Sequence, residues 1–329
     1  MNKTITEALT SFDQDIDINS IDMKPLLGGI SKSKLFKFNA NGKTYVLRLL
    51  AKDKPLESRI SEISAHRIAD NLDIAPKVVY IDSEENPNIV IMEFVEGRLF
   101  EREDLSNKTL LKKIMVALKE FQNYPKKFGI SNKTNIDGID DLYKRKLDKG
   151  TIYPSGFNEM LNELKEDYRL FSAGKSIIHG DLNPGNIIIT KEEKIYFIDF
   201  ALSGIDNPFA DIGWFACILG ATDKQISDIL EAYLNRTPTI NETKCVKFFI
   251  NETNFLLATL WIGRQDERDK ETLDNILASN DLKRSSEYIN EGITVDHIIK
   301  QNNSLELTKY ALSWFKEFRS LREAIDKMG

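Results

Sequence analysis

Residues 176–200 read S-I-I-H-G-D-L-N-P-G-N-I-I-I-T-K-E-E-K-I-Y-F-I-D-F, and the rest of the chain is interpreted from them. Residues 179–186 are rich in Gly, Pro, Asn and Asp, which favours a loop over a helix or strand. Two β-branched runs, 187–190 and 195–198, flank a charged tetrad, which is typical of a β-hairpin with a four-residue connection. Asn186 would enter this hairpin and Asp199 would leave it at the same end. The side chains of Asp181, Asn186 and Asp199 are therefore expected to converge.

Three oxygen-bearing side chains suit Mg²⁺, which binds carboxylate and carbonyl oxygens and keeps phosphate as a further ligand. The spacing H-x-D-L-x-x-x-N followed by I-D-F resembles the catalytic loop and metal-binding aspartate of kinases. More specifically, residues 179–186 resemble the H-G-D-x-x-P-x-N loop of the aminoglycoside phosphotransferase and choline kinase superfamily. The resemblance implies that Asp181 is the catalytic base, that Asn186 and Asp199 bind metal, and that His179 supports them. An ordinary Gly/Asp/Asn loop before a hairpin is the alternative.

Composition sets broad limits on the function. The 329 residues, 41% hydrophobic and 29% charged, suffice for two modest domains or one bilobal domain with a substantial core. A net charge of −6 gives no general attraction to nucleic acid or anionic membranes and is compatible with a cationic substrate. The only cysteines, Cys217 and Cys245, argue against a disulfide framework. The longest apolar run, 255–262, is far shorter than the ~20 residues of a membrane helix. A cytoplasmic protein is expected, without a signal sequence, membrane insertion or nucleic-acid binding.

Residues 24–50 alternate as strands do, and Asn41-Gly42 between two such runs predicts a hairpin. Before it, residues 27–34 read L-G-G-I-S-K-S-K. Glycines can bring backbone N–H groups close to phosphate, although paired glycines also make simple turns. The segment resembles the phosphate loop that opens the superfamily, which implies nucleotide-phosphate binding by Gly28, Gly29, Ser31 and Lys32.

Arg48 interrupts an otherwise apolar strand, 45–50, so its guanidinium requires a partner. Kinases supply a phosphate and a helix glutamate at this point, usually to a lysine. The V-L-R sequence resembles the arginine of choline and ethanolamine kinases instead. A helix is predicted over 56–72, and the resemblance makes its Glu62 the partner of Arg48, with Glu57 as the competing candidate. A surface arginine on an edge strand is the alternative.

Residues 88–98 predict a buried strand that runs into a turn and resemble the M-E-F-x-x-G connection between kinase lobes. The resemblance implies adenine contacts from the backbone around Glu93 and Val95. It also implies an α+β, bilobal protein-kinase-like fold, with a small mainly antiparallel β N-terminal lobe (1–95) and a larger, mostly helical C-terminal lobe (96–329).

The C-terminal part predicts helices over 105–124, 159–171, 223–235, 241–263 and 304–327. Segments 126–158 and 265–290 are polar and receive no element. Asp211-Ile212-Gly213 resembles the D-L-A segment of the superfamily, whose aspartate braces the catalytic loop; an ordinary helix N-cap is the equal alternative. Residues 254–264 resemble the tryptophan-bearing helix of choline and ethanolamine kinases, which implies that Trp261 helps bind a quaternary ammonium. Packing of Trp261 in a helical core is the favoured alternative.

The resulting hypothesis is an ATP- and Mg²⁺-dependent kinase that phosphorylates a hydroxyl of a small cationic acceptor such as choline or ethanolamine. Aminoglycoside, thiamine, homoserine and sugar kinases of the superfamily are alternatives. A protein kinase is disfavoured because Gly180 replaces the arginine that reads a phosphorylated activation loop, and residues 200–211 leave no room for that loop. A catalytically inactive nucleotide-binding module predicts loss of Asp181, Asn186 or Asp199, and all three are present. The oligomeric state is expected to be a monomer or a homodimer.

Overall fold

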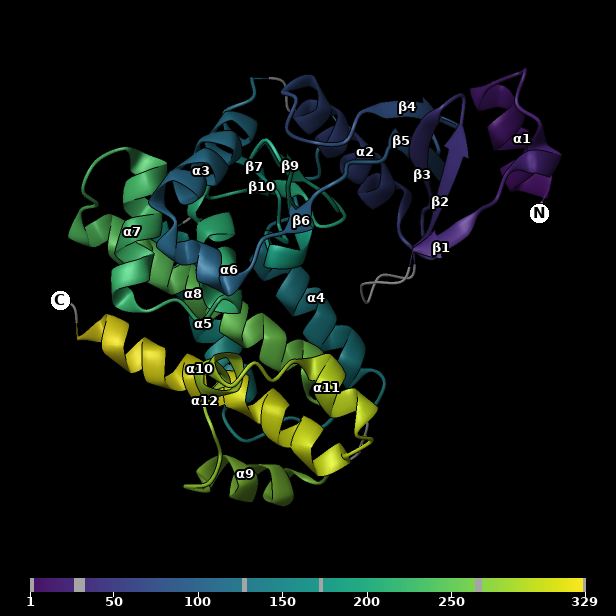
Figure 1. Cartoon of the computed structure of the whole chain (residues 1–329). Helices are drawn as coiled ribbons and strands as arrows, with labels where there is room; N and C mark the ends of the chain where they lie inside the picture. Colours follow the sequence, from purple (N-terminus) through teal and green to yellow (C-terminus); the bar gives the residue numbers. More distant parts are fainter. Residues whose placement is uncertain (1–2, 27–32, 126–128, 172–173, 264–267, 328–329) are drawn as a thin grey trace. The chain divides into compact units, whose positions relative to one another are not determined.

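The computed structural model describes residues 3–26, 33–125, 129–171, 174–263 and 268–327 (Figure 1). The chain forms two compact units, each assembled from separate segments. Unit 1 comprises Met1–Asp104, Lys113–Asn132 and His179–Gly204, and unit 2 comprises Leu105–Lys112, Lys133–Ile178 and Ile205–Gly329. Residues 179–204 thus belong to the same unit as the N-terminal strands. The finer division into lobes at residue 95 stays a prediction.

The N-terminal part of unit 1 is a five-stranded antiparallel sheet with the strand order β1-β2-β3-β5-β4. Its strands are β1 (Lys24–Leu26), β2 (Lys34–Ala40), β3 (Lys43–Leu49), β4 (Val78–Ile81) and β5 (Ile89–Glu93). The predicted hairpin joins β2 to β3, and Asn41 and Gly42 form its turn with φ values of 50° and 72°. Positive φ at both positions is what a two-residue type I′ turn requires.

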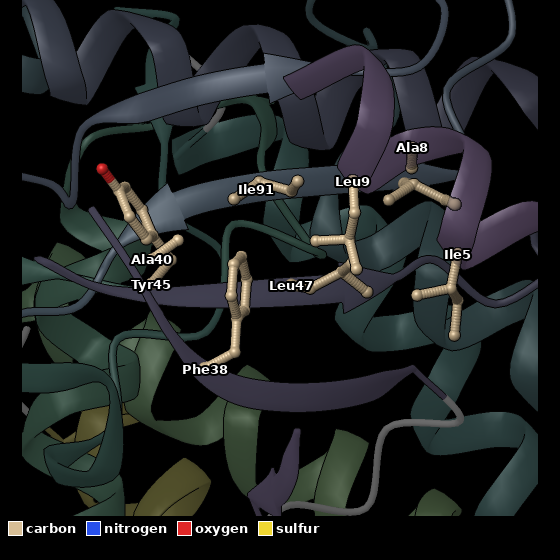
Figure 2. Packing of buried hydrophobic residues seen from close by; sticks show 9 residues of the cluster. Ile5, Ala8, Leu9, Phe38, Ala40, Tyr45, Leu47 and Ile91 are labelled. Carbon is tan, nitrogen blue, oxygen red and sulfur yellow. The ribbon is translucent and has the colours of Figure 1, made fainter. Parts of the chain in front are cut away.

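The two faces of β3 pack against different helices, because successive side chains point to opposite sides of a strand. Figure 2 shows one face, where Leu47 and Phe38 pack with Leu9 of helix α1 (Lys3–Phe12). On the other face, Val46 packs with Ile63 of helix α2 (Leu56–Asn71). Arg48 shares the face of Val46, so the alternation alone directs its guanidinium toward α2.

β3 is the central strand of the sheet, and Arg48 is only 7% exposed. The alternative of a surface arginine on an edge strand is therefore wrong.

The hairpin predicted within residues 187–198 is present in unit 1. Strands β8 (Ile187–Ile189) and β9 (Ile195–Phe197) pair antiparallel, and β6 (Arg98–Leu99) extends them into a three-stranded sheet. The Thr190 N–H donates to the Lys194 carbonyl at 3.0 Å and closes the four-residue connection. Unit 1 also takes in most of helix α3 (Lys108–Gln122). Short 3₁₀ helices occupy Ile18–Ser20, Arg102–Ser106 and Pro184–Asn186.

Unit 2 is mostly helical. Its helices are α4 (Asn135–Leu147), α5 (Phe157–Phe171), α6 (Phe209–Ile218), α7 (Asp223–Leu234), α8 (Ile240–Trp261), α9 (Lys270–Ala278), α10 (Ser285–Asn290), α11 (Val295–Lys300) and α12 (Ser304–Asp326). Two short strands, β7 (Ser176–Ile178) and β10 (Gly204–Asp206), pair beside them. The core of the unit joins α5, α8 and α12, where Phe157 lies 4.5 Å from Phe255 and 4.7 Å from Phe315 between ring centroids. Figure 1 shows α8 (green) and α12 (yellow) in this unit.

Some helices were not expected. Helix α4 lies in segment 126–158, and α9 and α10 lie in segment 265–290, where no element was predicted. A local signal for α4 was available, because Thr134 and Asp137 form a reciprocal capping box and Ile136, Ile139 and Tyr143 are buried at helical spacing. Helix α3 starts at Lys108 rather than at 105, because Arg102–Ser106 forms a 3₁₀ helix. No helix in the described part of the chain has both the length and the apolar character needed to cross a bilayer.

Candidate active site

The loop between β7 and β8 holds the carboxylate of Asp181 by both oxygens. The side-chain amide of Asn183 donates to Oδ1 at 2.9 Å, and the amide of Asn186 donates to Oδ2 at 3.1 Å. The Asn186 amide also donates to the backbone carbonyl of Asp181 at 2.9 Å. The conformation of this carboxylate is therefore fixed from within the loop.

The hairpin brings Asp199 to the same place. The backbone carbonyl of Asn186 accepts a hydrogen bond from the N–H of Ile198 at 3.0 Å, and Asp199 follows directly. Asp199 has a φ of 62°, in the left-handed region that aspartate tolerates better than most side chains. Asp181, Asn186 and Asp199 therefore converge at one end of the hairpin, as expected.

His179 contacts both the loop that carries Asp181 and the strand end that carries Asp199. Its ring is fully buried, its Nε2 lies 3.0 Å from the Ile198 carbonyl, and its Nδ1 accepts from the N–H of Asp181 at 3.3 Å. These partners fit a neutral imidazole with its proton on Nε2. Burial lowers the pKa of His179 to about 4, so the ring stays neutral. Its ring centroid lies 4.8 Å from that of Phe200.

Gly180 is required by a close backbone contact. Its φ is 78°, and a β-carbon at this position would lie 2.2 Å from the carbonyl oxygen of Leu202. A protein-kinase arginine could not occupy this position without displacing the turn that follows Asp199. The glycine in H-G-D thus lets the catalytic loop pack directly against that turn.

Arg48 lies beside this loop in a cluster of ion pairs. Its Nη2 is 2.9 Å from Glu62 Oε1 on α2 and 2.8 Å from Asp199 Oδ1. Glu57, the competing candidate, instead accepts a hydrogen bond from Ser131 Oγ at 3.3 Å. Burial is the largest influence on Asp199 and works to raise its pKa, but the charge and the hydrogen bond of Arg48, together with smaller nearby charges, outweigh burial and lower that pKa below its ordinary value.

The cluster contains a residue that the sequence did not indicate. Lys54 donates to Glu62 Oε2 and to the carbonyl oxygen of Ala201, both at 2.7 Å. A lysine in a polar turn carries no local signal for such a role. In the same cluster, the Nε atom of Arg48 is buried and has no hydrogen-bond partner among the described residues. The guanidinium therefore keeps a donor that its two carboxylate partners do not use.

The expected nucleotide contacts are only partly visible. Gly28, Gly29, Ser31 and Lys32 lie outside the described residues. Glu93 ends β5, its N–H donates to the Lys77 carbonyl at 2.9 Å, and its carboxylate accepts from Lys43 at 3.0 Å. Its amide is thus already used. Val95 follows the strand and makes no hydrogen bond to any other residue in the described ranges. The adenine contacts stay a prediction.

The side chains at the end of the hairpin fit a magnesium ion. Asn186 donates through its amide nitrogen, so its Oδ1 is left without a partner in the described structure, and so is Asp199 Oδ2. Mg²⁺ commonly takes one or two protein oxygens and fills the remaining positions with phosphate and water. No group of three or more His, Cys, Asp or Glu side chains in the described ranges is placed to hold a metal. Asn186 Oδ1 and Asp199 Oδ2 are the two protein oxygens that suit such a cation.

The sequence around this site matches a known enzyme family. The model of the Phosphotransferase enzyme family matches residues 22–244, about two thirds of the chain, including the whole of the Asp181, Asn186 and Asp199 arrangement. The chain belongs to this family. It is therefore a phosphotransferase that acts on hydroxyl groups, and a small-molecule kinase of the aminoglycoside phosphotransferase and choline kinase superfamily.

Solved structures with similar folds include several kinases. A choline/ethanolamine kinase family protein from Mesorhizobium loti is 16% identical, with a TM-score of 0.61 and coverage of 94% of this chain and 99% of that one. Choline kinase LicA from Streptococcus pneumoniae is 18% identical, with a TM-score of 0.63 and coverage of 78% and 88%. An ADP-bound aminoglycoside phosphotransferase is 19% identical, with a TM-score of 0.59 and coverage of 84% and 95%.

At these identities the similarity establishes the fold, which is the α+β protein-kinase-like fold that was expected. A search of the curated proteins found no match.

Two expected site residues of the phosphotransferase lie in unit 2. Asp211 is buried in the first turn of α6, but it is not the helix cap, because α6 begins at Phe209 and Pro208 occupies the N-cap position. The N-cap interpretation of Asp211 is therefore wrong, and its bracing role stays a prediction. Trp261 ends α8, is buried, and packs edge-on against Tyr310 at 6.4 Å between centroids. It also lies beyond the residues that match the family, and its role in acceptor binding stays a prediction.

Unit 2 of the phosphotransferase also buries two carboxylates that the sequence did not reveal. Asp206 accepts hydrogen bonds from Tyr168 Oη and from the N–H groups of Asn135 and Asn207, the latter two at 3.0 and 2.7 Å. Glu252 of α8 is 1% exposed, and neither of its carboxylate oxygens has a partner among the described residues. Burial, and then the nearby charge of Asp206, raise the pKa of Glu252 well above its ordinary value. Burial therefore favours the protonated, neutral form of the Glu252 carboxyl group.

Proposed function

We propose that this phosphotransferase is an ATP- and Mg²⁺-dependent kinase whose acceptor is a small cationic alcohol, with choline and ethanolamine as the leading candidates. The observation that carries the proposal is the convergence of Asp181, Asn186 and Asp199 beside Arg48. A base, two oxygen ligands and a buried cation are the groups that phosphoryl transfer to a hydroxyl needs. We further propose a cytoplasmic enzyme that acts on small molecules without nucleic acid, as a monomer or a homodimer.

Each residue has a physical role in this proposal. Asp181 accepts the proton of the acceptor hydroxyl, and its amide partners hold the carboxylate in one orientation for that step. Asn186 Oδ1 and Asp199 would hold Mg²⁺, which supplies positive charge against the nucleotide phosphates when it is bound. Arg48 attracts a nucleotide phosphate by its positive charge, and Glu62 orients the guanidinium.

The other expected residues complete the proposed site. Gly28, Gly29, Ser31 and Lys32 bind nucleotide phosphates, and the backbone of Glu93 and Val95 contacts adenine. His179 holds the catalytic loop by its buried hydrogen bonds, and Asp211 is the candidate for a bracing role. Trp261 is the candidate for the cationic end of the acceptor.

The preference for choline or ethanolamine has three supports. The structures of choline and ethanolamine kinases match with TM-scores of 0.60 to 0.64, slightly above the 0.54 to 0.59 of the aminoglycoside phosphotransferases. Arg48 stands where most kinases have lysine, and a net charge of −6 suits a cationic acceptor. An aminoglycoside is the second candidate, because its phosphotransferases share the fold and its amines are also cationic.

The test is an acceptor panel. Purified protein is given Mg·ATP with choline, ethanolamine, thiamine, homoserine or an aminoglycoside, and ADP release is measured. We expect choline or ethanolamine to exceed the other acceptors in kcat/KM by about tenfold or more. A preference for the aminoglycoside would select the second candidate. ADP release no greater than that of an Asp181→Asn control, with every acceptor, would contradict the proposal and favour an inactive nucleotide-binding module.

A further inference from the structure

Lys54 is the fourth charged side chain of the cluster formed by Arg48, Glu62 and Asp199. It lies in the turn between β3 and α2, and its ammonium donates to Glu62 Oε2 and to the carbonyl of Ala201, both at 2.7 Å. The Lys54 side chain is 20% exposed, whereas that of Glu62 is 4% exposed. Lys54 therefore connects Glu62 of α2 with the turn that follows Asp199.

The ion pairs make Arg48 a shared cation. A single nitrogen, Nη2, carries both its contact with Glu62 and its contact with Asp199. One guanidinium cannot neutralise two carboxylates, and a buried carboxylate without a counter-charge costs several kcal/mol. Lys54 supplies the second positive charge, so that two cations face two carboxylates and the cluster is neutral.

We propose that Lys54 is a positioning residue for phosphoryl transfer: it neutralises Glu62, so that Arg48 stays available to Asp199 and to the nucleotide phosphates. This inference rests on the proposed function, in which Arg48 binds a phosphate. Without Lys54, Arg48 would be the only cation beside Glu62 and Asp199, and the two carboxylates would compete for it. The cluster would also carry a net negative charge, which repels phosphate.

The bond to Ala201 gives Lys54 a second, mechanical effect. The turn after Asp199 is closed by the Ser203 N–H, which donates to the Phe200 carbonyl at 3.1 Å. Ser61 of α2 reaches the same turn by donating from its hydroxyl to the Ser203 carbonyl at 2.9 Å. Lys54 adds a charged donor to this attachment, and it thereby holds Asp199 in its left-handed conformation.

Charge compensation tests the electrostatic step. The variants are Lys54→Met and Lys54→Met combined with Glu62→Gln. The control is Lys52→Met, because Lys52 is exposed in the same turn and forms no ion pair with any described residue. Affinity for ADP is measured by calorimetry in EDTA, so that no metal contributes.

We expect Lys54→Met to weaken ADP binding about tenfold or more, and the double variant to bind ADP at least about threefold more tightly than Lys54→Met, although it also lacks the Glu62 partner of Arg48. Lys52→Met should bind as the wild type does. A merely structural role of Lys54 would not be repaired by removing a second native charge.

Amide hydrogen exchange of the free protein tests the mechanical step. Exchange at the Ser203 amide should rise about fivefold or more in Lys54→Met, stay unchanged in Lys52→Met, and return toward the wild-type rate in Lys54→Arg. Unchanged ADP affinity in Lys54→Met, or a double variant as weak as the single one, would overturn the inference. Failure of the wild type to bind ADP both in EDTA and with Mg²⁺ restored would instead contradict the proposed function, and exchange at Ser203 would still report whether Lys54 holds the turn.

Discussion

Replacing Gly180 by alanine tests the backbone contact that holds the catalytic loop against the turn after Asp199. Two costs follow from the structure. A non-glycine residue at a φ of 78° costs about 1–2 kcal/mol. The new β-carbon would also lie 2.2 Å from the Leu202 carbonyl oxygen, and relief of such overpacking costs about 1–3 kcal/mol more. Together we expect a loss of about 2–5 kcal/mol in the free energy of unfolding.

Gly42→Ala is the matched control for this change. Gly42 lies in the same unit, has a φ of 72°, and would place a β-carbon where nothing lies within 4 Å. It should therefore show only the backbone cost, about 1–2 kcal/mol. The difference between the two variants measures the contact between Gly180 and Leu202 alone.

Two assays separate stability from positioning. Urea unfolding gives the free energies, and steady-state kinetics on the best acceptor of the panel gives kcat. Displacement of the Leu202 turn by about 1 Å would misplace Asp199, and an error of that size lowers kcat roughly 100-fold. Gly42→Ala should leave kcat unchanged. Equal stability losses in the two variants, with kcat preserved in Gly180→Ala, would refute this account of the loop.

The remaining predictions concern the proposed base, the metal ligand and the buried carboxylate. Asp181→Asn should lower kcat by about 10²–10⁴ while Mg·ATP binding persists, whereas Asp199→Ala should weaken Mg·ATP binding as well; equal binding by calorimetry in both variants would contradict the two roles. Glu252→Gln should raise the melting temperature more at about pH 8 than at about pH 5. The pKa of Glu252 is raised in the folded state, so its contribution to stability is complete below its unfolded-state pKa and is lost as pH rises through the folded-state value. A neutral glutamine does not have this loss at high pH. A stabilisation independent of pH in a calorimetric scan would show that Glu252 does not carry this proton.

Local patterns predicted the parts of the fold that depend on neighbouring residues. The Asn41-Gly42 hairpin and the hairpin after Asn186 formed as expected, because alternation and turn chemistry act over a few residues. The same locality explains the misses. Glycines and polar residues obscure the periodicity of helix α4, although its capping box at Thr134 is a usable local signal. The sequence around Asp211 is also compatible with a helix cap, but α6 begins two residues earlier.

The sequence by itself determined the order of the motifs and the loop of residues 179–186. It also determined the convergence of Asp181, Asn186 and Asp199, because one hairpin links these residues. Only the tertiary structure decided that Glu62 rather than Glu57 pairs with Arg48, and that Lys54 completes the cluster. Arg48 and Asp199 are 151 positions apart, and Lys54 and Ala201 are 147 apart. Contacts at such separations depend on how a sheet, a helix and a loop pack together, and no periodicity in the sequence records that packing.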